Sequence, residues 1–239
     1  MPKARYDAIY QELRTRVMNG IYKTHELLPS ENEFTEEFGC SRNTLRRAIA
    51  MLTDEAFVQP IHGKGVRVIW NENTHDVIGS LEGVESFNEY AKRNGQTAST
   101  EVIEFENVEC TEEMSHRLGF DPGDALIRLV RVRSLNGKAR QVDFDYFLES
   151  AVRGLTPEIA SKSIYSYLEG ELGMRIPTCR RTISVNLANE DDKKYLDLEE
   201  YNCVAVMDNQ SYTSDGVLFE CTSAHIHPEI FHYWVTARR

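Results

Sequence analysis

Three amphipathic helices are predicted in the first part of the chain, because apolar residues recur there every three or four positions. The apolar positions of the first helix are Tyr6, Ile9, Leu13 and Val17. Ser30 and Glu33 have the spacing of a capping box, in which each side chain bonds the backbone N–H of the other residue, so the second helix is predicted to begin there. The third is predicted from Ser41 to about Glu55, after a turn of only two residues, Gly39-Cys40.

The second and third helices, joined by so short a turn, have the pattern of a helix-turn-helix. The polar first turn of the third helix would reach base edges in the major groove, with Arg42 and Arg46 on the same side of the helix. Two strand-like runs, 58–61 and 66–69, follow, and the small, basic turn between them could approach a phosphate backbone. The pattern predicts a winged helix-turn-helix. Such units also bind proteins, in which case Arg42 and Arg46 would form a solvated face.

Strand-like runs alternate with short helical stretches in the rest of the chain. The expected strands are 125–134, 140–147, Thr178–Leu187, 204–213, 217–227 and 231–236, and the expected helices are 163–172 and 190–198. Asn136-Gly137 and Ser214-Asp215-Gly216 indicate hairpins. Hairpins outnumber crossovers, so we expect an α+β fold with a mostly antiparallel sheet covered by helices.

A polar, aperiodic stretch separates the two patterns. It predicts a winged helix-turn-helix domain over residues 1–70, a linker over 71–78 and a second domain over 79–239.

Composition narrows the class of protein. The chain has 239 residues, 41% hydrophobic and 27% charged, which is typical of a globular protein, and it has no long apolar run that would span a membrane. The net charge is −11, but the first 70 residues carry 10 basic and 9 acidic side chains, so the acidic excess lies in the second domain. Five cysteines without a Cys-x-x-Cys pair indicate reduced thiols in a cytoplasmic protein.

Candidate chemistry in the second domain centres on two arginines. Arg131 and Arg133 alternate on one strand and project from the same face. A helix predicted to begin at Ser163 would present backbone N–H groups that favour an anion, so the two elements could together hold a phosphate. The alternative is a solvent-exposed strand face on which the arginines pair with Asp143 or Asp145.

The first domain resembles the winged-helix domain of the GntR family of bacterial transcription regulators. The resemblance is carried by three motifs in order: Leu28-Pro29-Ser30-Glu31-Asn32-Glu33-Phe34, Ser41-Arg42-Asn43-Thr44-Leu45-Arg46-Arg47-Ala48 and His62-Gly63-Lys64-Gly65. It implies binding of double-stranded operator DNA by Glu31, Arg42, Asn43, Thr44, Arg46, His62, Gly63 and Lys64. Asn32 departs from the family pattern, which usually has Arg there.

The second domain resembles the effector domain of the HutC-type subgroup of the family, whose fold is similar to that of chorismate lyase. The resemblance implies a phosphate site made of Ser86, Arg131, Arg133, Ser163 and Tyr165, and sugar contacts by Asp143 and Glu220. Within the subgroup, Asp143-Phe144-Asp145-Tyr146-Phe147 and Ser163-Ile164-Tyr165-Ser166-Tyr167-Leu168 are similar to repressors of trehalose operons, which implies trehalose 6-phosphate as effector. Another phosphosugar, such as an amino-sugar 6-phosphate, remains the alternative.

The expected protein is therefore a homodimeric repressor that a sugar phosphate releases from its operator, with no cofactor, no metal, no membrane contact and no catalytic residue. One rival is a metal sensor, because Cys221, His225, His227 and His232 lie close together and residues 225 and 227 would share a strand face. The other is an enzyme, although the chain has no nucleophile elbow, no glycine-rich nucleotide loop and no His-Glu-x-x-His.

Overall fold

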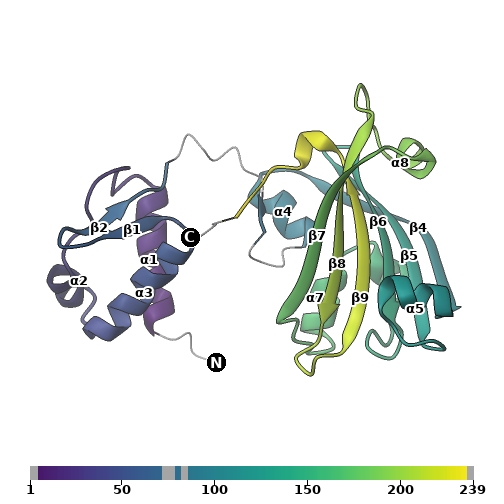
Figure 1. Ribbon diagram of the computed structural model, residues 1–239, viewed down its shortest axis with the longest axis horizontal. Coiled ribbons are helices and arrows are strands. Elements are labelled where there is room, and N and C mark those ends of the chain that lie inside the picture. Colours follow the sequence, from purple (N-terminus) through teal and green to yellow (C-terminus); the bar gives the residue numbers. More distant parts are fainter. Residues whose placement is uncertain (1–4, 72–78, 82–85, 236–239) are drawn as a thin grey trace. The chain divides into compact units, whose positions relative to one another are not determined.

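The computed structural model describes residues 5–71, 79–81 and 86–235. The chain divides into two compact units, Met1–Val77 with Trp234–Arg239 and Ile78–Tyr233 (Figure 1). Of the predicted linker, only Asn71 lies within the described residues, and the end of the last predicted strand, Thr236, lies outside them.

The first unit, here called the head, has three helices followed by a hairpin (Figure 1). The helices are α1 (Arg5–Met18), α2 (Glu31–Glu37) and α3 (Arg42–Asp54), and β1 (Val58–Ile61) pairs antiparallel with β2 (Gly65–Val68). Ser30 caps α2 in the predicted capping box, and the Ser41 hydroxyl accepts a hydrogen bond from the Thr44 backbone N–H at the start of α3. The predicted winged helix-turn-helix is confirmed.

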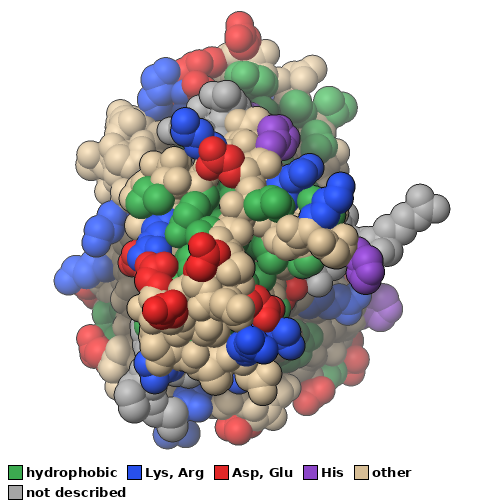
Figure 2. All heavy atoms as spheres, turned by 90° about the vertical axis from the view of Figure 1, so that its left-hand side faces the viewer, with side chains coloured by type: hydrophobic (Ala, Val, Ile, Leu, Met, Phe, Trp, Pro, Cys, Tyr) green, Lys and Arg blue, Asp and Glu red, His purple; other side chains and the backbone are tan. Residues whose placement is uncertain are grey.

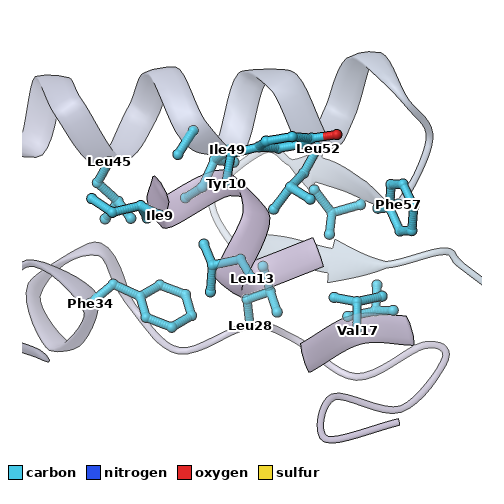
Figure 3. Close-up of a cluster of buried hydrophobic side chains, with 13 residues drawn as sticks. Ile9, Tyr10, Leu13, Val17, Leu28, Phe34, Leu45, Ile49, Leu52 and Phe57 are labelled. Atoms are coloured by element: carbon cyan, nitrogen blue, oxygen red, sulfur yellow. The ribbon is translucent and has the colours of Figure 1, made fainter. Parts of the chain in front are cut away.

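The head has a mixed surface and an apolar interior cluster. On the side seen in Figure 2, Lys and Arg side chains are interspersed with Asp and Glu. Inside, the apolar faces of the three helices meet around Leu13, Phe34, Leu45 and Leu52, each of which has no exposed surface (Figure 3). Burial of a leucine or phenylalanine side chain stabilises a fold by about 1.5–3 kcal/mol. This core fixes how α2 and α3 lie against each other.

The second unit, here called the body, is built on a six-stranded antiparallel sheet of order β4-β5-β6-β9-β8-β7 (Figure 1). The strands are β4 (Ala98–Glu109), β5 (Ala125–Leu135), β6 (Lys138–Leu148), β7 (Thr178–Leu187), β8 (Cys203–Tyr212) and β9 (Leu218–Ile226). Asn136 and Gly137 have φ values of 51° and 82°, which the two-residue turn between β5 and β6 requires. A separate short pair joins β3 (Gly79–Ser80) to β10 (Tyr233–Trp234).

Helices cover both faces of the sheet. The helices on the first face are α4 (Phe87–Arg93), α6 (Pro157–Ala160) and α7 (Ile164–Gly170), and those on the second are α5 (Glu112–Leu118) and α8 (Glu190–Tyr195). Successive residues of β6 show the division, because Phe147 packs in the cluster of α6 and α7 whereas Tyr146 packs in the cluster of α5. The predicted α+β class is confirmed. The sequence predicted no element at β4, α4 or α5.

No helix among the described residues is long and apolar enough to cross a membrane.

Candidate functional site

The base-reading arginines predicted on α3 are held by the first two residues of α2. Arg46 donates from Nε and Nη2 to the two carboxylate oxygens of Glu31, at 2.8 and 2.9 Å. Arg42 donates from Nη2 to the Asn32 Oδ1 atom at 2.9 Å. The hydrogen bonds from Arg46 hold the pKa of Glu31 below its ordinary value. The structure thus brings Glu31, Arg42 and Arg46 together, and it gives Asn32 a role that the sequence did not reveal.

The first turn of α3 presents its polar side chains to solvent. Arg42, Asn43 and Arg46 are exposed and Thr44 is half-buried, while Leu45 points into the core. The Arg46 side chain is 63% exposed although it is paired, so a phosphate or a base edge can compete for its donors. Arg47 points elsewhere, because its guanidinium carbon lies 3.9 Å from the centre of the Tyr6 ring.

The remaining predicted DNA contacts lie at the tip of the β1–β2 hairpin. His62, Gly63 and Lys64 are exposed there, and Gly63 has a φ of 71°, a conformation that suits glycine. In the described part of the chain, no hydrogen bond or ion pair joins this tip to α3. The arrangement offers a helix for a groove and a small, basic loop for a phosphate backbone.

In the body, one cavity collects all the side chains predicted for the effector. This inner cavity has a volume of about 120 Å³ and lies between α4, α7 and the first face of the sheet. Its lining includes Ser86, Arg131, Arg133, Asp143, Ser163, Tyr165 and Glu220. These residues come from five different elements or their caps, so the pocket depends on the whole fold of the body.

A network of buried ion pairs forms one wall of the inner cavity. Arg131 lies 2.7 Å from Asp145 and 3.4 Å from Asp143, and Arg133 Nε donates to Asp143 at 2.5 Å. Arg131, Asp143 and Asp145 are almost fully buried. The alternative of a solvent-exposed strand face is therefore wrong, although the pairing it proposed is present. The error has a simple cause: α4 and α7 cover this face of the sheet, and strand alternation does not predict which face is covered.

Burial and neighbouring charges shift the pKa values of both aspartates. Burial raises the pKa of Asp145 to about 6, against the attraction of Arg131. Burial acts in the same direction on Asp143, but the charges of Arg133 and Arg131 outweigh it and lower its pKa. Arg131 and Arg133 already pair with these two aspartates, so an added phosphate would have to replace existing partners of the arginines.

The hydroxyl groups of the site already have partners. Tyr165 donates to Glu220 at 2.5 Å, and burial, followed by the charge of Glu220, raises the pKa of this tyrosine well above its ordinary value. The Ser86 hydroxyl donates to Glu89 at 2.7 Å within the capping box of α4. The Ser163 hydroxyl accepts hydrogen bonds from Ser166 at the start of α7. A ligand that bonds to these hydroxyl groups must replace their present hydrogen bonds.

Sequence reasoning missed several side chains of the cavity. Gln141 donates to Asp143 at 2.6 Å, and Thr222 donates to Asp145 at 2.8 Å. The Arg133 guanidinium carbon lies 5.2 Å from the centre of the Phe87 ring. Lys162 and Arg181 also line the cavity. Gln141 and Thr222 had a local signal, since each lies two residues from a predicted site residue, Asp143 or Glu220, on the same strand face.

Three of the four residues of the proposed metal sensor have separate partners. His225 Nδ1 lies 2.6 Å from Asp192, His227 Nε2 lies 3.0 Å from Arg140, and Cys221 donates to the Leu118 carbonyl. The expectation that His225 and His227 share a strand face is wrong, because β9 ends at Ile226. Across residues 5–71, 79–81 and 86–235, no three His, Cys, Asp or Glu side chains form a group that could hold a metal.

Comparison with known proteins agrees with this architecture. Residues 5–68 match the model of the bacterial regulatory proteins of the gntR family, and residues 93–232 match that of the UTRA domain. The HTH-type transcriptional regulator TreR of Bacillus subtilis is 32% identical over 235 residues, which is 98% of each chain.

Two solved structures are similar in fold. The possible transcriptional regulator YydK of Bacillus subtilis has a TM-score of 0.80 at 22% identity, covering 98% of this chain and 100% of that one. The effector binding domain of the Bacillus subtilis trehalose repressor (TreR) has a TM-score of 0.54 at 31% identity, covering 59% of this chain and 98% of that one. With a GntR head, a UTRA body and a regulator similar over nearly its whole length, this chain belongs to the GntR family of bacterial transcriptional regulators, in the group that carries a UTRA domain.

Proposed function

We propose that this chain is the repressor of a trehalose-utilisation operon and that trehalose 6-phosphate releases it from its operator. One observation carries the proposal: the inner cavity collects Arg131 and Arg133, the hydroxyl groups of Ser86, Ser163 and Tyr165, and the carboxylates of Asp143 and Glu220, which are groups that recognise a phosphate and sugar hydroxyls. The similarity to a trehalose repressor at 31–32% identity supports the choice of sugar.

The phosphate would bind Arg133 and Arg131 by accepting the N–H hydrogen bonds that Asp143 accepts from them in this structure. Arg133 is the more accessible of the two, since its side chain is 12% exposed and that of Arg131 only 4%. Ser86, Ser163 and Tyr165 would supply hydroxyl donors, and Asp143 and Glu220, released from their present partners, would accept from sugar hydroxyls. Binding would thus rearrange contacts between β5, β6, β9 and α7.

Release of the operator requires that the effector bind one conformation of the protein more tightly than another. In this account two heads read the half-sites of a near-palindromic operator, and the effector favours a conformation that cannot span both. Glu31, Arg42, Asn43, Thr44 and Arg46 would contact one half-site through α3, and His62, Gly63 and Lys64 would contact the backbone. Because operator DNA lies in the bacterial cytoplasm, so would the protein.

The dimer would form through the body, which leaves the heads available for DNA. The edge strand β7 supports this choice, because Ile183, Val185 and Leu187 are 39%, 68% and 78% exposed on one side of it. An edge strand with exposed apolar side chains readily pairs with a second chain. We assign no enzymatic role to the chain, in keeping with its relatives, which are regulators.

A second candidate effector is a monosaccharide phosphate, such as an amino-sugar 6-phosphate. The small volume of the inner cavity, about 120 Å³, favours it.

The experiment that tests the proposal is release of operator DNA. An operator fragment is first selected by the full chain from a random-sequence pool, and its complex is followed by fluorescence anisotropy. Trehalose 6-phosphate should dissociate the complex, while unphosphorylated trehalose should not. If only an amino-sugar phosphate dissociates the complex, the second candidate is the effector. A complex that no phosphosugar dissociates would refute the proposal.

A further inference from the structure

A second, larger cavity adjoins the inner one. This outer cavity has a volume of about 480 Å³ and lies between the first turn of α4, α7 and the beginning of β7. Four of the described residues line both cavities: Ser86, Tyr165, Cys179 and Arg181. A ligand bound in the inner cavity could therefore extend directly into the outer one.

The inner cavity is too small for a complete disaccharide phosphate. Pockets that enclose a ligand of that size have volumes of about 300–1,000 Å³, whereas the inner cavity offers about 120 Å³. If the arginines hold the phosphate there, a second sugar ring has to lie outside this volume. The outer cavity has room for it.

The lining of the outer cavity suits a neutral sugar ring. The Glu169 carboxylate has no hydrogen-bond or ion-pair partner among the described residues, and Thr178 and Arg181 add a hydroxyl and a guanidinium. Among the described residues, Arg181 has one hydrogen bond, from its Nε to Asn209 Oδ1 at 2.8 Å, so its other nitrogens remain for a ligand. Leu81 and Ile176 supply apolar surface for the carbon-bound hydrogens of a ring.

Glu169 lies on the same helix as Tyr165, a residue of the proposed effector site. It lies four residues after Tyr165 on α7, so both side chains project from the same side of the helix. Tyr165 faces both cavities and Glu169 only the outer one. One helix therefore serves both cavities.

We propose that the outer cavity is the subsite for the unphosphorylated ring of a disaccharide phosphate, with Glu169 accepting hydrogen bonds from its hydroxyls. The inference rests on the proposed function, in which the inner cavity holds the phosphate and the ring that carries it. It makes the outer cavity the part of the protein that distinguishes a disaccharide phosphate from a monosaccharide phosphate.

The test compares two probes, trehalose 6-phosphate and glucose 6-phosphate, by calorimetric titration of the full chain. Wild-type protein should bind trehalose 6-phosphate at least about tenfold more tightly, as expected for one good hydrogen bond to a charged group. Glu169→Gln should remove about tenfold of the affinity for trehalose 6-phosphate and leave that for glucose 6-phosphate unchanged. Thr178→Trp, which fills the outer cavity from an exposed position, should act in the same way.

Glu171→Gln is the matched control, because it removes the same charge two residues further along, outside both cavities, and should change neither affinity. Equal wild-type affinities for the two probes, or unchanged trehalose 6-phosphate binding in both Glu169→Gln and Thr178→Trp, would overturn the subsite while leaving the phosphosugar site in place. If neither probe binds wild-type protein, the proposed function is overturned, and the subsite with it.

Discussion

The Arg131 guanidinium lies 2.7 Å from the Asp145 carboxylate, and both side chains are buried beneath the inner cavity. Asp145 also accepts a hydrogen bond from Thr222 on β9. Together these contacts link three neighbouring strands, β5, β6 and β9. They lie directly under the proposed phosphate site. A ligand there acts on the middle of the sheet.

The buried position of Asp145 predicts a pH dependence of stability. Its pKa is raised from an ordinary value of 3.8 to about 6 in the folded protein, so between these values the folded state keeps a proton that the unfolded state has lost. This contribution to stability is full below about pH 4 and is lost as the pH rises through about 6. Asp145→Asn, which cannot titrate, should remove this decrease in stability between about pH 4 and pH 6.

The measurement is the melting temperature of wild-type and Asp145→Asn protein from about pH 5 to pH 7. The difference between the two isolates Asp145, because His227, whose pKa is lowered by burial and by Arg140 and which acts in the opposite direction, is common to both. Parallel pH profiles would contradict the assignment.

Cys179 offers a chemical probe of the cavities, because its half-buried side chain lines both. Trehalose 6-phosphate at saturation should slow its modification by a thiol reagent several-fold. Cys40 and Cys203, also half-buried but outside both cavities, serve as internal controls whose rates should stay constant. Mass spectrometry of digested protein gives the rate at each site. An unchanged rate at Cys179 would place the effector elsewhere.

Arg46 is expected to contact operator DNA, and Arg46→Ala should weaken operator binding by about 1–3 kcal/mol if the contact is bidentate to a base. Arg47→Ala is the matched control, since Arg47 is the neighbouring arginine of α3 but lies over Tyr6. Anisotropy titrations with the selected operator compare the three proteins. If Arg46→Ala binds as tightly as wild type, α3 does not read the operator as proposed.

The exposed apolar side of β7 should mediate dimerisation. Val185→Glu places a charge among Ile183 and Leu187 and should raise the dissociation constant of the dimer by at least about tenfold, because a charge in an apolar interface must be desolvated. Val217→Glu, at another exposed valine outside β7, is the control. Sedimentation over a range of concentrations measures both. A dimer unaffected by Val185→Glu would exclude this edge.

Local signals in the sequence predicted much of the fold. The capping box of Ser30 and Glu33 marked the start of α2, and Asn136-Gly137 marked the hairpin between β5 and β6. Thr178–Leu187 was predicted with the bounds that β7 has. Each of these signals lies within a few residues of the feature it predicts.

Features without such a local signal were missed. Strand β4 lies at the sheet edge and carries Glu101, Glu104 and Glu106 among its apolar residues, so its alternation is weak. The burial of Arg131 and Arg133 depends on α4 and α7, which are distant in the sequence. The outer cavity likewise joins β7 to α4 and α7, a meeting that only the folded chain reveals.

The most direct test of the account is thermal unfolding of wild-type protein with trehalose 6-phosphate, trehalose, glucose 6-phosphate, N-acetylglucosamine 6-phosphate or zinc, beside the Arg133→Ala variant. A ligand at 100 times its dissociation constant stabilises a fold by about 2.7 kcal/mol. Trehalose 6-phosphate should give wild-type protein the largest rise in melting temperature and should leave the melting temperature of Arg133→Ala unchanged. Arg117→Ala, which alters an exposed arginine outside both cavities, should respond like wild type. An equal rise in Arg133→Ala, or no rise with any phosphosugar, would contradict the proposed function.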